Sequence, residues 1–194
     1  MRRMPTVETM HFPVFIELEG APCLVVGGGC VAERKIKTLA EFGARVKVVA
    51  KKVSPSIRDG GFAAEIAERA FEDGDIRGAK LVVAATGDAE ADSRVALLCK
   101  AAGVMVNSVD RPEDCTFFFP AVFKDGCMTA GFSSGGKCPV AAQTMRNIFA
   151  RLAPDGFFRK AERLCAMRER MKGEYPDPDA RRNAYLKEFE EWRG

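Results

Sequence analysis

The feature that most constrains this chain is an apolar run, a glycine-rich turn and an amphipathic segment, joined without interruption over residues 23–42. Cys23–Val26 is a short continuous apolar run, which is typical of a strand covered on both faces. After the turn, apolar residues fall on one helical stripe, and Gly43 is suited to end that helix. The stripe consists of Ala32, Ile36, Leu39 and Ala40. This order of elements predicts the opening unit of a dinucleotide-binding fold.

Strand and helix patterns continue to alternate as far as residue 108. A short strand is also expected before the glycine turn, at Val14–Leu18. The later predicted elements are a strand at Val46–Val49, a helical linker at Ser54–Asp59, strands at Ala63–Ala70 and Leu81–Ala85, a helix that ends at Gly103 and a strand at Val104–Ser108. Strands that alternate with helices are joined by right-handed crossovers in a parallel sheet. We therefore predict an α/β fold with a Rossmann-like, doubly wound parallel sheet.

After Asp110 the pattern changes to short apolar runs that are rich in phenylalanine. The predicted strands are Phe117–Phe119, Val122–Phe123 and Met128–Phe132, with a turn at Lys124–Gly126 between the last two. A small antiparallel piece with this composition leaves an apolar face that needs a cover. A second subunit is the natural cover, so this segment is predicted to form a dimer contact.

The C-terminal part is predicted to be helical, with helices at Pro139–Leu152, Phe157–Lys172 and Asp179–Trp192. Three regions are therefore expected along the chain. Residues 1–113 form a Rossmann-like dinucleotide-binding domain, residues 114–150 a small dimerisation segment with a substrate loop, and residues 151–194 a C-terminal helical domain.

The glycine turn fits the pattern G-x-G-x-x-A directly after a strand and at the start of a helix. Gly27 permits the tight turn, Gly29 lets the backbone approach a pyrophosphate, and Ala32 keeps the helix close to the sheet. The residues expected to bind the cofactor here are Gly27, Gly28, Gly29, Cys30, Val31 and Ala32. This interpretation is favoured over a purely structural turn because the strand and the helix stand on either side.

An acidic residue that would bind the ribose hydroxyls is missing after the second strand, where the chain reads Val49–Lys52. Lys51 and Lys52 are candidates to approach the adenosine ribose or a 2′-phosphate. A solvated lysine pair at a strand end explains them equally well. Spacing alone therefore leaves the choice between NAD and NADP open.

Polar residues also follow the later strands, at the sheet edge where ligands of this architecture bind. Asp110 is a candidate general base beside a nicotinamide, or alternatively a turn residue before Arg111 and Pro112. Asn107, on the strand that precedes it, is expected to contact the substrate. Thr86 either contacts the cofactor or caps the next turn.

A second polar loop precedes the helix predicted to begin at Pro139. Its hydroxyls, two glycines and a lysine would suit a carboxylate or a phosphate at a helix N-terminus. The candidate residues are Ser133, Ser134, Gly135, Gly136 and Lys137. A plain helix-capping loop explains the same residues, and a nearby dinucleotide site makes the substrate-anion interpretation competitive with it.

Composition excludes several other classes of protein. The net charge of +3 is small, and basic residues on the C-terminal helices alternate with glutamates, so no nucleic-acid partner is expected. Apolar stretches are broken well before the ~18 residues of a membrane span, and Pro5–Thr9 offers no signal-peptide core. Seven dispersed cysteines and one histidine, His11, indicate reduced thiols without a metal site. A cytoplasmic location is expected.

Four stretches resemble the dehydrogenase part of siroheme synthases, which is the precorrin-2 dehydrogenase and sirohydrochlorin ferrochelatase family. They are Phe12–Phe15, Val25–Lys35, Asn107–Pro112 and Phe132–Pro139, in the same order as in the family. The resemblance covers nearly the whole chain. Separate motifs in register are much more specific than a glycine turn alone.

The resemblance implies NAD-dependent oxidation of precorrin-2 to sirohydrochlorin by a homodimer, in which the C-terminal helices complete the active-site cleft. Asp110 matches the family's catalytic aspartate, and Ser134 matches a serine of its substrate loop. Cys30–Val31 and Lys51–Lys52 match positions that line the dinucleotide, in a family that also lacks the acidic residue. NAD is therefore expected as the cofactor. Some members also insert Fe²⁺ into sirohydrochlorin, and the residues leave that second activity open.

Two other functions remain as alternatives. A non-catalytic, nucleotide-sensing Rossmann regulatory module would explain Gly27–Ala32, but it gives no reason for Asp110 or for the polar loop before Pro139. An enzyme that uses NADP on an unrelated substrate would explain Lys51 and Lys52.

Overall fold

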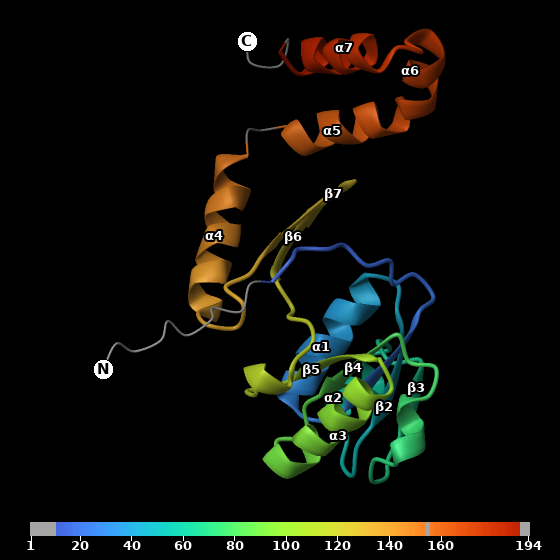
Figure 1. Cartoon of the computed structure of the whole chain (residues 1–194), viewed down its shortest axis with the longest axis vertical. Coiled ribbons are helices and arrows are strands. Elements are labelled where there is room, and N and C mark those ends of the chain that lie inside the picture. The colour runs from blue at the N-terminus through green and yellow to red at the C-terminus, as the bar shows by residue number, and fades with distance from the viewer. Residues whose placement is uncertain (1–10, 154–155, 191–194) are drawn as a thin grey trace, which may run out of the picture. The chain divides into compact units, whose positions relative to one another are not determined.

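The computed structural model describes residues 11–153 and 156–190 and divides into two compact units, Met1–Phe119 and Pro120–Gly194 (Figure 1). The first unit holds the strand and helix alternation, and the second holds a hairpin and helices. The functional boundaries expected at residues 113 and 150 remain predictions.

The first unit is built on a five-stranded parallel sheet in the order β3-β2-β1-β4-β5. The strands are β1 (Pro22–Val26), β2 (Arg45–Val49), β3 (Glu65–Ala67), β4 (Leu81–Ala84) and β5 (Met105–Ser108). The α-helices are α1 (Cys30–Glu41), α2 (Pro55–Asp59) and α3 (Ala89–Ala101), with short 3₁₀ turns η1 (Asp73–Ile76) and η2 (Pro112–Asp114). The strand order reverses at β1, which confirms the doubly wound Rossmann-like fold.

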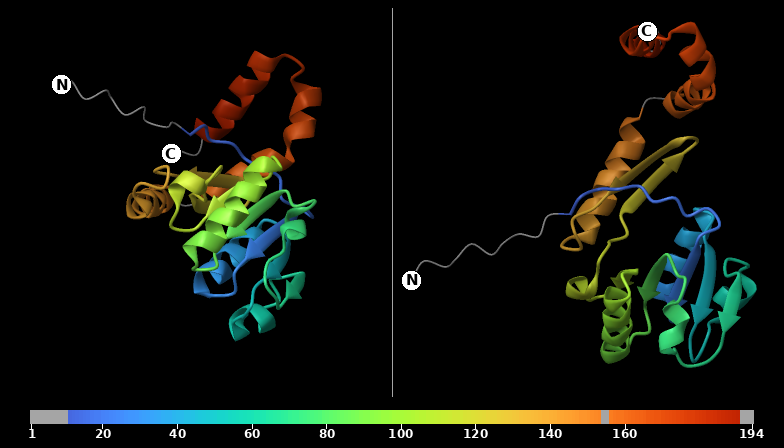
Figure 2. Two further views of the ribbon diagram at one scale, coloured as in Figure 1. Left: turned by 60° about the horizontal axis from the view of Figure 1, so that its bottom comes forward. Right: turned by 45° about the vertical axis from the view of Figure 1, so that its right-hand side comes forward.

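Both faces of this sheet are covered, which explains the continuous apolar runs in β1 and β4. On one face, Val25 and Val83 belong to a buried cluster that includes Ile36 of α1 and Ile57 of α2. On the other face, residues of the same strands pack with α3, and the two layers can be followed in Figure 2. That second cluster includes Leu24, Val26, Val82, Val95 and Cys99.

The strand expected at Val14–Leu18 is wrong, because this segment is irregular. The neighbours of β1 are β2 and β4, so the segment adds no strand to the sheet. Phe15 remains 79% exposed, while Leu18 packs against the core and Lys80 donates a hydrogen bond of 2.6 Å to the Glu17 carbonyl. Side-chain packing and single hydrogen bonds, not strand pairing, hold this stretch.

The strand expected at Phe117–Phe119 is also wrong. The N–H of Thr116 donates to the Val106 carbonyl at 2.8 Å, and the chain then runs on as an irregular segment. Phe117 and Phe119 pack onto the α1 side of the core, with ring centroids 5.3 Å apart. Burial against the sheet therefore accounts for this apolar run.

The second unit begins with the antiparallel hairpin of β6 (Ala121–Asp125) and β7 (Met128–Phe132). Its turn is Gly126–Cys127, so Lys124 and Asp125 of the predicted Lys124–Gly126 turn belong to β6 instead. Four helices follow: α4 (Pro139–Leu152), α5 (Phe157–Ala166), α6 (Arg168–Glu174) and α7 (Pro178–Glu190). The single helix predicted over Phe157–Lys172 is therefore broken at Met167, and Trp192 lies outside the described residues.

Phenylalanine rings form the contacts between this hairpin and its helices. Phe123 of β6 lies 5.3 Å from the ring of Phe149 on α4 and 4.8 Å from that of Phe158 on α5. Phe132 of β7 lies 5.6 Å from Phe149. Part of the apolar hairpin is thus covered within one chain. Within the two described ranges, no helix has the length and apolar content needed to cross a membrane.

Candidate active site

The glycine turn occupies the carboxyl end of β1, at the point where the strand order reverses. Gly27 has a φ of +134°, and its N–H donates to the Val49 carbonyl at 2.9 Å. A Cβ at this position would overlap with the backbone carbonyl oxygen of Ala85. Both the backbone conformation and the contact with the end of β4 therefore require glycine here.

Gly28 has a steric role that the motif does not reveal, since its position in G-x-G-x-x-A accepts any residue. A Cβ on Gly28 would overlap with the Lys52 carbonyl oxygen and lie 2.9 Å from the Val53 Cα. The Ser54 N–H also donates to the Gly28 carbonyl at 3.0 Å. The turn is thus packed directly against the chain that leaves β2.

Gly29 is different, because a Cβ there would meet no atom within 4 Å. Gly29 is the N-cap residue of α1, with φ −92° and ψ −173°, and no side chain caps the helix. Gly29 and Cys30 are exposed, Val31 is half-buried, and Ala32 is completely buried against the sheet. The first N–H groups of a helix have no partner within it, so this end can receive a phosphate.

Lys51 and Lys52 form an exposed bend after β2. Glu68, a carboxylate that sequence reasoning missed, lies close to this bend. Hydrogen bonding from Arg58, at 2.7 Å, and from the Val53 N–H, at 3.3 Å, lowers the pKa of Glu68. The exposed charges directly after β2 are therefore those of the two lysines, while the Glu68 carboxylate is hydrogen-bonded to Arg58 and to the Val53 N–H.

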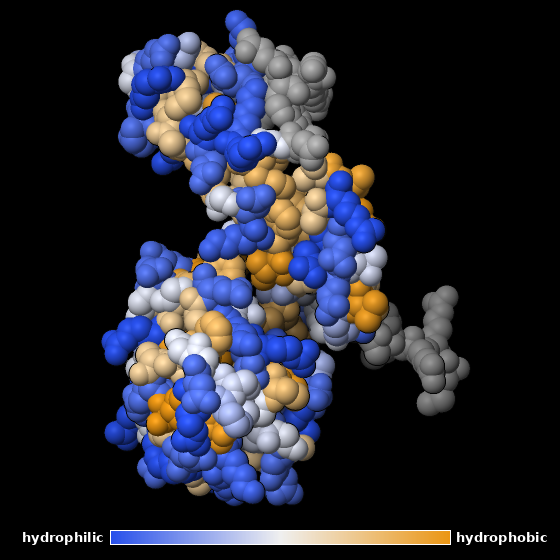
Figure 3. Space-filling model, turned by 180° about the vertical axis from the view of Figure 1, so that it is seen from behind, coloured by the Kyte–Doolittle hydropathy of each residue, from blue (hydrophilic) through white to orange (hydrophobic). Residues whose placement is uncertain are grey.

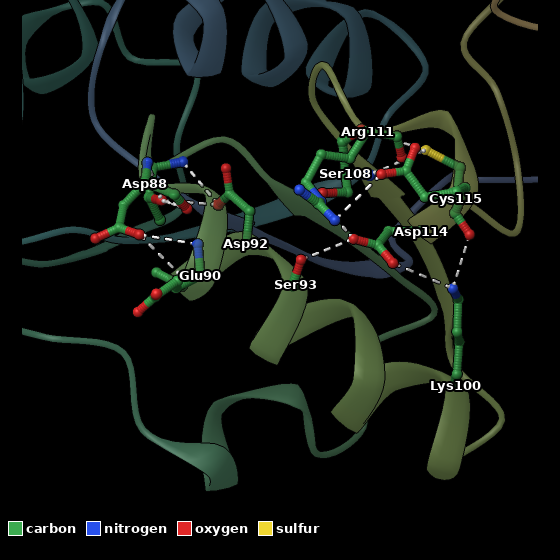
Figure 4. Close-up of polar contacts among 12 residues, drawn as sticks. Asp88, Glu90, Asp92, Ser93, Lys100, Ser108, Arg111, Asp114 and Cys115 are labelled. Carbon is green, nitrogen blue, oxygen red and sulfur yellow. Dashed lines mark hydrogen bonds and ion pairs between the residues drawn. The ribbon is translucent and has the colours of Figure 1, made fainter.

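Thr86 follows β4, and its contacts fulfil the capping role that the sequence left open. Its hydroxyl donates to the Asp92 carboxylate at 2.8 Å, and its N–H donates to the same oxygen at 3.0 Å. Asp88 caps the N-terminus of α3 by accepting from the N–H groups of Glu90 and Ala91 (Figure 4). Asp92 is only 4% exposed and was also missed, because an aspartate inside a helix carries no distinctive signal.

Asp110 lies two residues beyond β5, at the same edge of the sheet, and its side chain is exposed. Its φ of +60° places it in the left-handed region, the single non-glycine residue there within residues 11–153 and 156–190. Aspartate tolerates this region better than most residues, and strained backbone is common at functional sites. The turn thus fixes an exposed carboxylate just beyond the strand.

Asn107 and Cys115 hold the loop that follows β5. Asn107 is buried, and its amide donates to the Phe117 carbonyl at 3.1 Å and to the Cys115 sulfur at 3.5 Å. The Cys115 thiol donates to the Ser108 carbonyl at 3.2 Å, and burial raises its pKa. Both amide hydrogens of Asn107 are therefore used inside the protein, and its contact with substrate stays a prediction.

An ion-pair network closes the same loop onto α3 (Figure 4). Arg111 donates to Asp114 at 2.6 Å, Ser93 donates to the same carboxylate at 2.9 Å, and Lys100 lies 3.7 Å from it. Hydrogen bonding to Arg111, and then to Ser93, lowers the pKa of Asp114. These contacts fix the far end of the turn that carries Asp110.

The second polar loop joins β7 to α4 in the other unit. The Ser134 hydroxyl accepts from the Cys138 N–H at 2.8 Å, and the Ser133 hydroxyl accepts from the Gly135 N–H at 3.1 Å. Gly135 and Gly136 both have left-handed φ values, +61° and +79°. These bonds lie within the loop, and no side chain caps the first N–H groups of α4, so the choice between a capping loop and a substrate loop stays open. Lys137 is exposed at its end, before the free N–H groups of α4.

The first unit brings most of the predicted residues to one edge. The glycine turn, Lys51–Lys52, Thr86 and Asp110 follow β1, β2, β4 and β5, whose carboxyl ends share that edge. Backbone contacts join neighbouring ends, as in the 2.9 Å bond from the Val109 N–H to the Ala84 carbonyl. Over the two described ranges, no group of three His, Cys, Asp or Glu side chains could hold a metal ion.

A parallel sheet of this order, with a glycine turn and an open helix N-terminus at its switch point, defines a dinucleotide-binding protein of the Rossmann class. The family described as "Putative NAD(P)-binding" matches residues 14–121. The chain belongs to this NAD(P)-binding family.

Comparison with curated proteins extends the similarity beyond the first unit. The siroheme synthase of Methylococcus capsulatus is 35% identical over 183 residues, which cover 93% of this chain and 38% of that protein. The siroheme synthase of Pseudomonas aeruginosa strain PAO1 is 38% identical over 174 residues, which cover 88% of this chain and 37% of that protein. The chain thus spans less than half the length of these relatives. These similarities confirm the resemblance to siroheme synthases.

A solved structure described as "SirC, precorrin-2 dehydrogenase" has the same fold. It superposes with a TM-score of 0.69 at 22% sequence identity and covers 91% of this chain and 88% of its own. At this coverage the similarity extends beyond the first unit into the second.

Proposed function

We propose that this protein is an NAD-dependent dehydrogenase that oxidises precorrin-2 to sirohydrochlorin in siroheme biosynthesis. The observation that carries the proposal is the sheet edge that joins an open helix N-terminus, at Gly29, with an exposed carboxylate, Asp110. A nucleotide-sensing module needs the first feature but not the second. Similarity to siroheme synthases over most of the chain supports the choice of substrate.

In the proposed reaction, each residue has a separate task. The N–H groups at the start of α1 would hold the pyrophosphate of NAD, and Lys51 and Lys52 would approach the adenosine ribose. Bound NAD would supply the hydride acceptor for oxidation of the reduced tetrapyrrole. Asp110 accepts a proton that the ring loses as it becomes conjugated.

The polar loop of the second unit is proposed to bind the substrate's carboxylates. Lys137 supplies a positive charge, and Ser133 and Ser134 each have a hydroxyl hydrogen to donate, because their oxygens are the acceptors in the two bonds of this loop. The open N-terminus of α4 adds a favourable dipole. Asn107 is also proposed to contact the substrate. Its amide, in addition, holds the loop that follows β5.

The reaction can be measured directly with the purified protein under anaerobic conditions. With precorrin-2 and NAD, we expect NADH and sirohydrochlorin to appear in equal amounts, with NADP a poorer oxidant. NADH and sirohydrochlorin are followed by their separate absorbance bands. Binding of NAD without any sirohydrochlorin would instead support the sensing module, and faster turnover with NADP would reverse the cofactor assignment.

Insertion of iron into sirohydrochlorin is an optional second activity of this proposal, with Fe²⁺ as a substrate. Incubation of sirohydrochlorin with Fe²⁺ or Co²⁺, with and without the protein, measures it as a rate above the uncatalysed one. Equal rates in the two samples would restrict the protein to the dehydrogenation.

We also propose that the active protein is a homodimer that works in the cytoplasm. Seven free cysteines fit a reducing compartment. The dimer proposal rests on α4, which presents large apolar side chains to solvent and has no buried residue (Figure 3). The exposed residues that share one helical face are Met145, Ile148, Phe149 and Leu152. A face of this kind is commonly covered by a second copy.

Replacing Ile148 and Leu152 together with glutamate is expected to convert the dimer to a monomer, because the partner would have to bury two charges. Sedimentation equilibrium gives the mass. Asn147→Glu is the matched control, since this exposed residue lies on the opposite side of the same helix. A double variant that keeps the mass of a dimer would place the subunit contact elsewhere, and a monomeric wild-type protein would remove the proposal.

A further inference from the structure

Two cysteines that the proposed reaction does not use meet in the second unit. Cys127 is in the turn between β6 and β7, and Cys165 is in the last turn of α5, 38 residues further along. Their sulfur atoms are 2.7 Å apart, which is closer than ordinary van der Waals contact between sulfurs, and both residues are exposed. Both thiols are therefore within reach of each other and of small molecules.

Packing of the hairpin on α5 holds the two thiols in place. Phe123 of β6 and Phe158 of α5 stack with ring centroids 4.8 Å apart. At the turn itself, the Cβ position of Gly126 lies 3.4 Å from the Glu162 carboxyl group, one helical turn before Cys165. Ala161 and Leu164 of the same helix are buried. The sulfur contact thus follows from the fold of this unit and not from the chance meeting of two mobile side chains.

We propose that Cys127 and Cys165 form a modification site, a dithiol that is oxidised reversibly to an intramolecular disulfide. The co-reactant is a low-molecular-weight disulfide such as oxidised glutathione. One cysteine thiolate attacks a sulfur of the small disulfide, which forms a mixed disulfide and releases one glutathione thiol. The second cysteine then attacks the protein sulfur of the mixed disulfide, and the second glutathione leaves. Two electrons and two protons pass from the protein to two glutathione molecules.

The other cysteines provide comparisons within the same chain. Cys23 and Cys99 are buried, and burial raises the pKa of each thiol to about 11, so they are poor reaction partners. Cys138 is exposed like the pair and lies in the same unit. If exposure alone decided reactivity, Cys138 would react as readily as Cys127. If the proximity of the two thiols decides it, a cross-link forms only between Cys127 and Cys165.

Oxidation would also affect the surface around the pair. Cys165 and Met128, the neighbour of Cys127, line a pocket of about 400 Å³ together with the basic residues Arg168, Lys172 and Arg181. A covalent bond would fix the hairpin turn to one wall of this pocket. Slower amide hydrogen exchange in the β6–β7 turn is therefore expected after oxidation.

The test uses the full chain, reduced and then incubated with excess oxidised glutathione, and blocks remaining thiols with N-ethylmaleimide. Hydrogen bonding to Cys165 raises the pKa of Cys127, so the incubation has to be long. Trypsin separates the relevant cysteines into peptides 125–137, 164–168 and 138–146. We expect one cross-linked species, in which peptide 125–137 is joined to peptide 164–168, and dithiothreitol should separate the two. Amide hydrogen exchange in the β6–β7 turn should also be slower in the oxidised protein.

The single variants C127S and C165S should each leave the remaining partner as a glutathione adduct or a free thiol, while C138S should form the cross-link as the wild-type protein does. Glutathione on both Cys127 and Cys165 of one molecule, or two free thiols after long incubation, would overturn the proposal. The readout is a mass and requires no turnover, so its outcome is independent of the dehydrogenase assignment.

Discussion

Replacing Asp110 with asparagine is expected to lower kcat for precorrin-2 oxidation at least ~100-fold and to leave the Kd for NAD unchanged. Asparagine has nearly the same shape and, like aspartate, tolerates the left-handed backbone that Asp110 adopts at φ +60°. The variant therefore removes the proton acceptor without disturbing the turn. Alanine would confuse the two effects, because it loses the carboxylate and also fits this backbone poorly.

Steady-state rates and NAD titrations of the same preparation measure the two quantities separately. Glu113→Gln is the matched control, since this exposed carboxylate belongs to the neighbouring η2 turn and should leave kcat close to that of the wild type. Asp110→Gly provides a second comparison, as it frees the backbone and also removes the carboxylate. If Asp110→Asn turns over at the wild-type rate, the residue has only a structural role in its turn.

The second large effect is expected at the glycine turn, where Gly29→Asp should weaken NAD binding ~100-fold or more, which corresponds to ~3 kcal/mol. The space at Gly29 is open in the protein, so the new side chain meets no atom of the fold. Aspartate is also one of the best N-cap residues, and the backbone of Gly29 is already extended as a cap requires. The fold should therefore keep its Tm, while a carboxylate occupies the place of the pyrophosphate.

Gly29→Ser separates charge from capping, because serine caps the helix equally well but is neutral. We expect this control to bind NAD more tightly than the aspartate variant, by isothermal titration calorimetry. Gly28→Ala is unsuitable as a control, since its Cβ would overlap with the backbone at Lys52. Wild-type affinity in Gly29→Asp would mean that the turn is structural and that the dinucleotide lies elsewhere.

The sequence was sufficient to predict the parallel sheet because its signal is local and repeated. The central strands β1 and β4 are short apolar runs, and Gly43, two residues after the end of α1, has the left-handed φ of +76° that suits a helix end. Val14–Leu18 and Phe117–Phe119 show the same apolar character without forming strands. An apolar run indicates that its side chains are buried or meet a partner surface. It does not indicate whether its backbone pairs with a neighbouring strand.

The residues of the candidate site could be predicted from the sequence only where they belong to a recognisable motif. Gly27 and Asp110 follow strands whose ends meet, so their common edge could be deduced from the fold class. The need for Gly28, by contrast, arises from a contact with Lys52, which is distant in the sequence. The meeting of Cys127 with Cys165 likewise depends on the packing of a hairpin against a helix, and seven dispersed cysteines give no indication of it.

The left-handed turn at Asp110 has a consequence for any attempt to make this protein more heat-resistant. A non-glycine residue in this backbone region costs the folded state about 1 kcal/mol or more, and glycine would relieve that cost. A screen that selects for stability alone would therefore favour loss of the very carboxylate to which the chemistry is assigned. Libraries for thermostability should hold position 110 constant, or pair the heat challenge with a measurement of turnover.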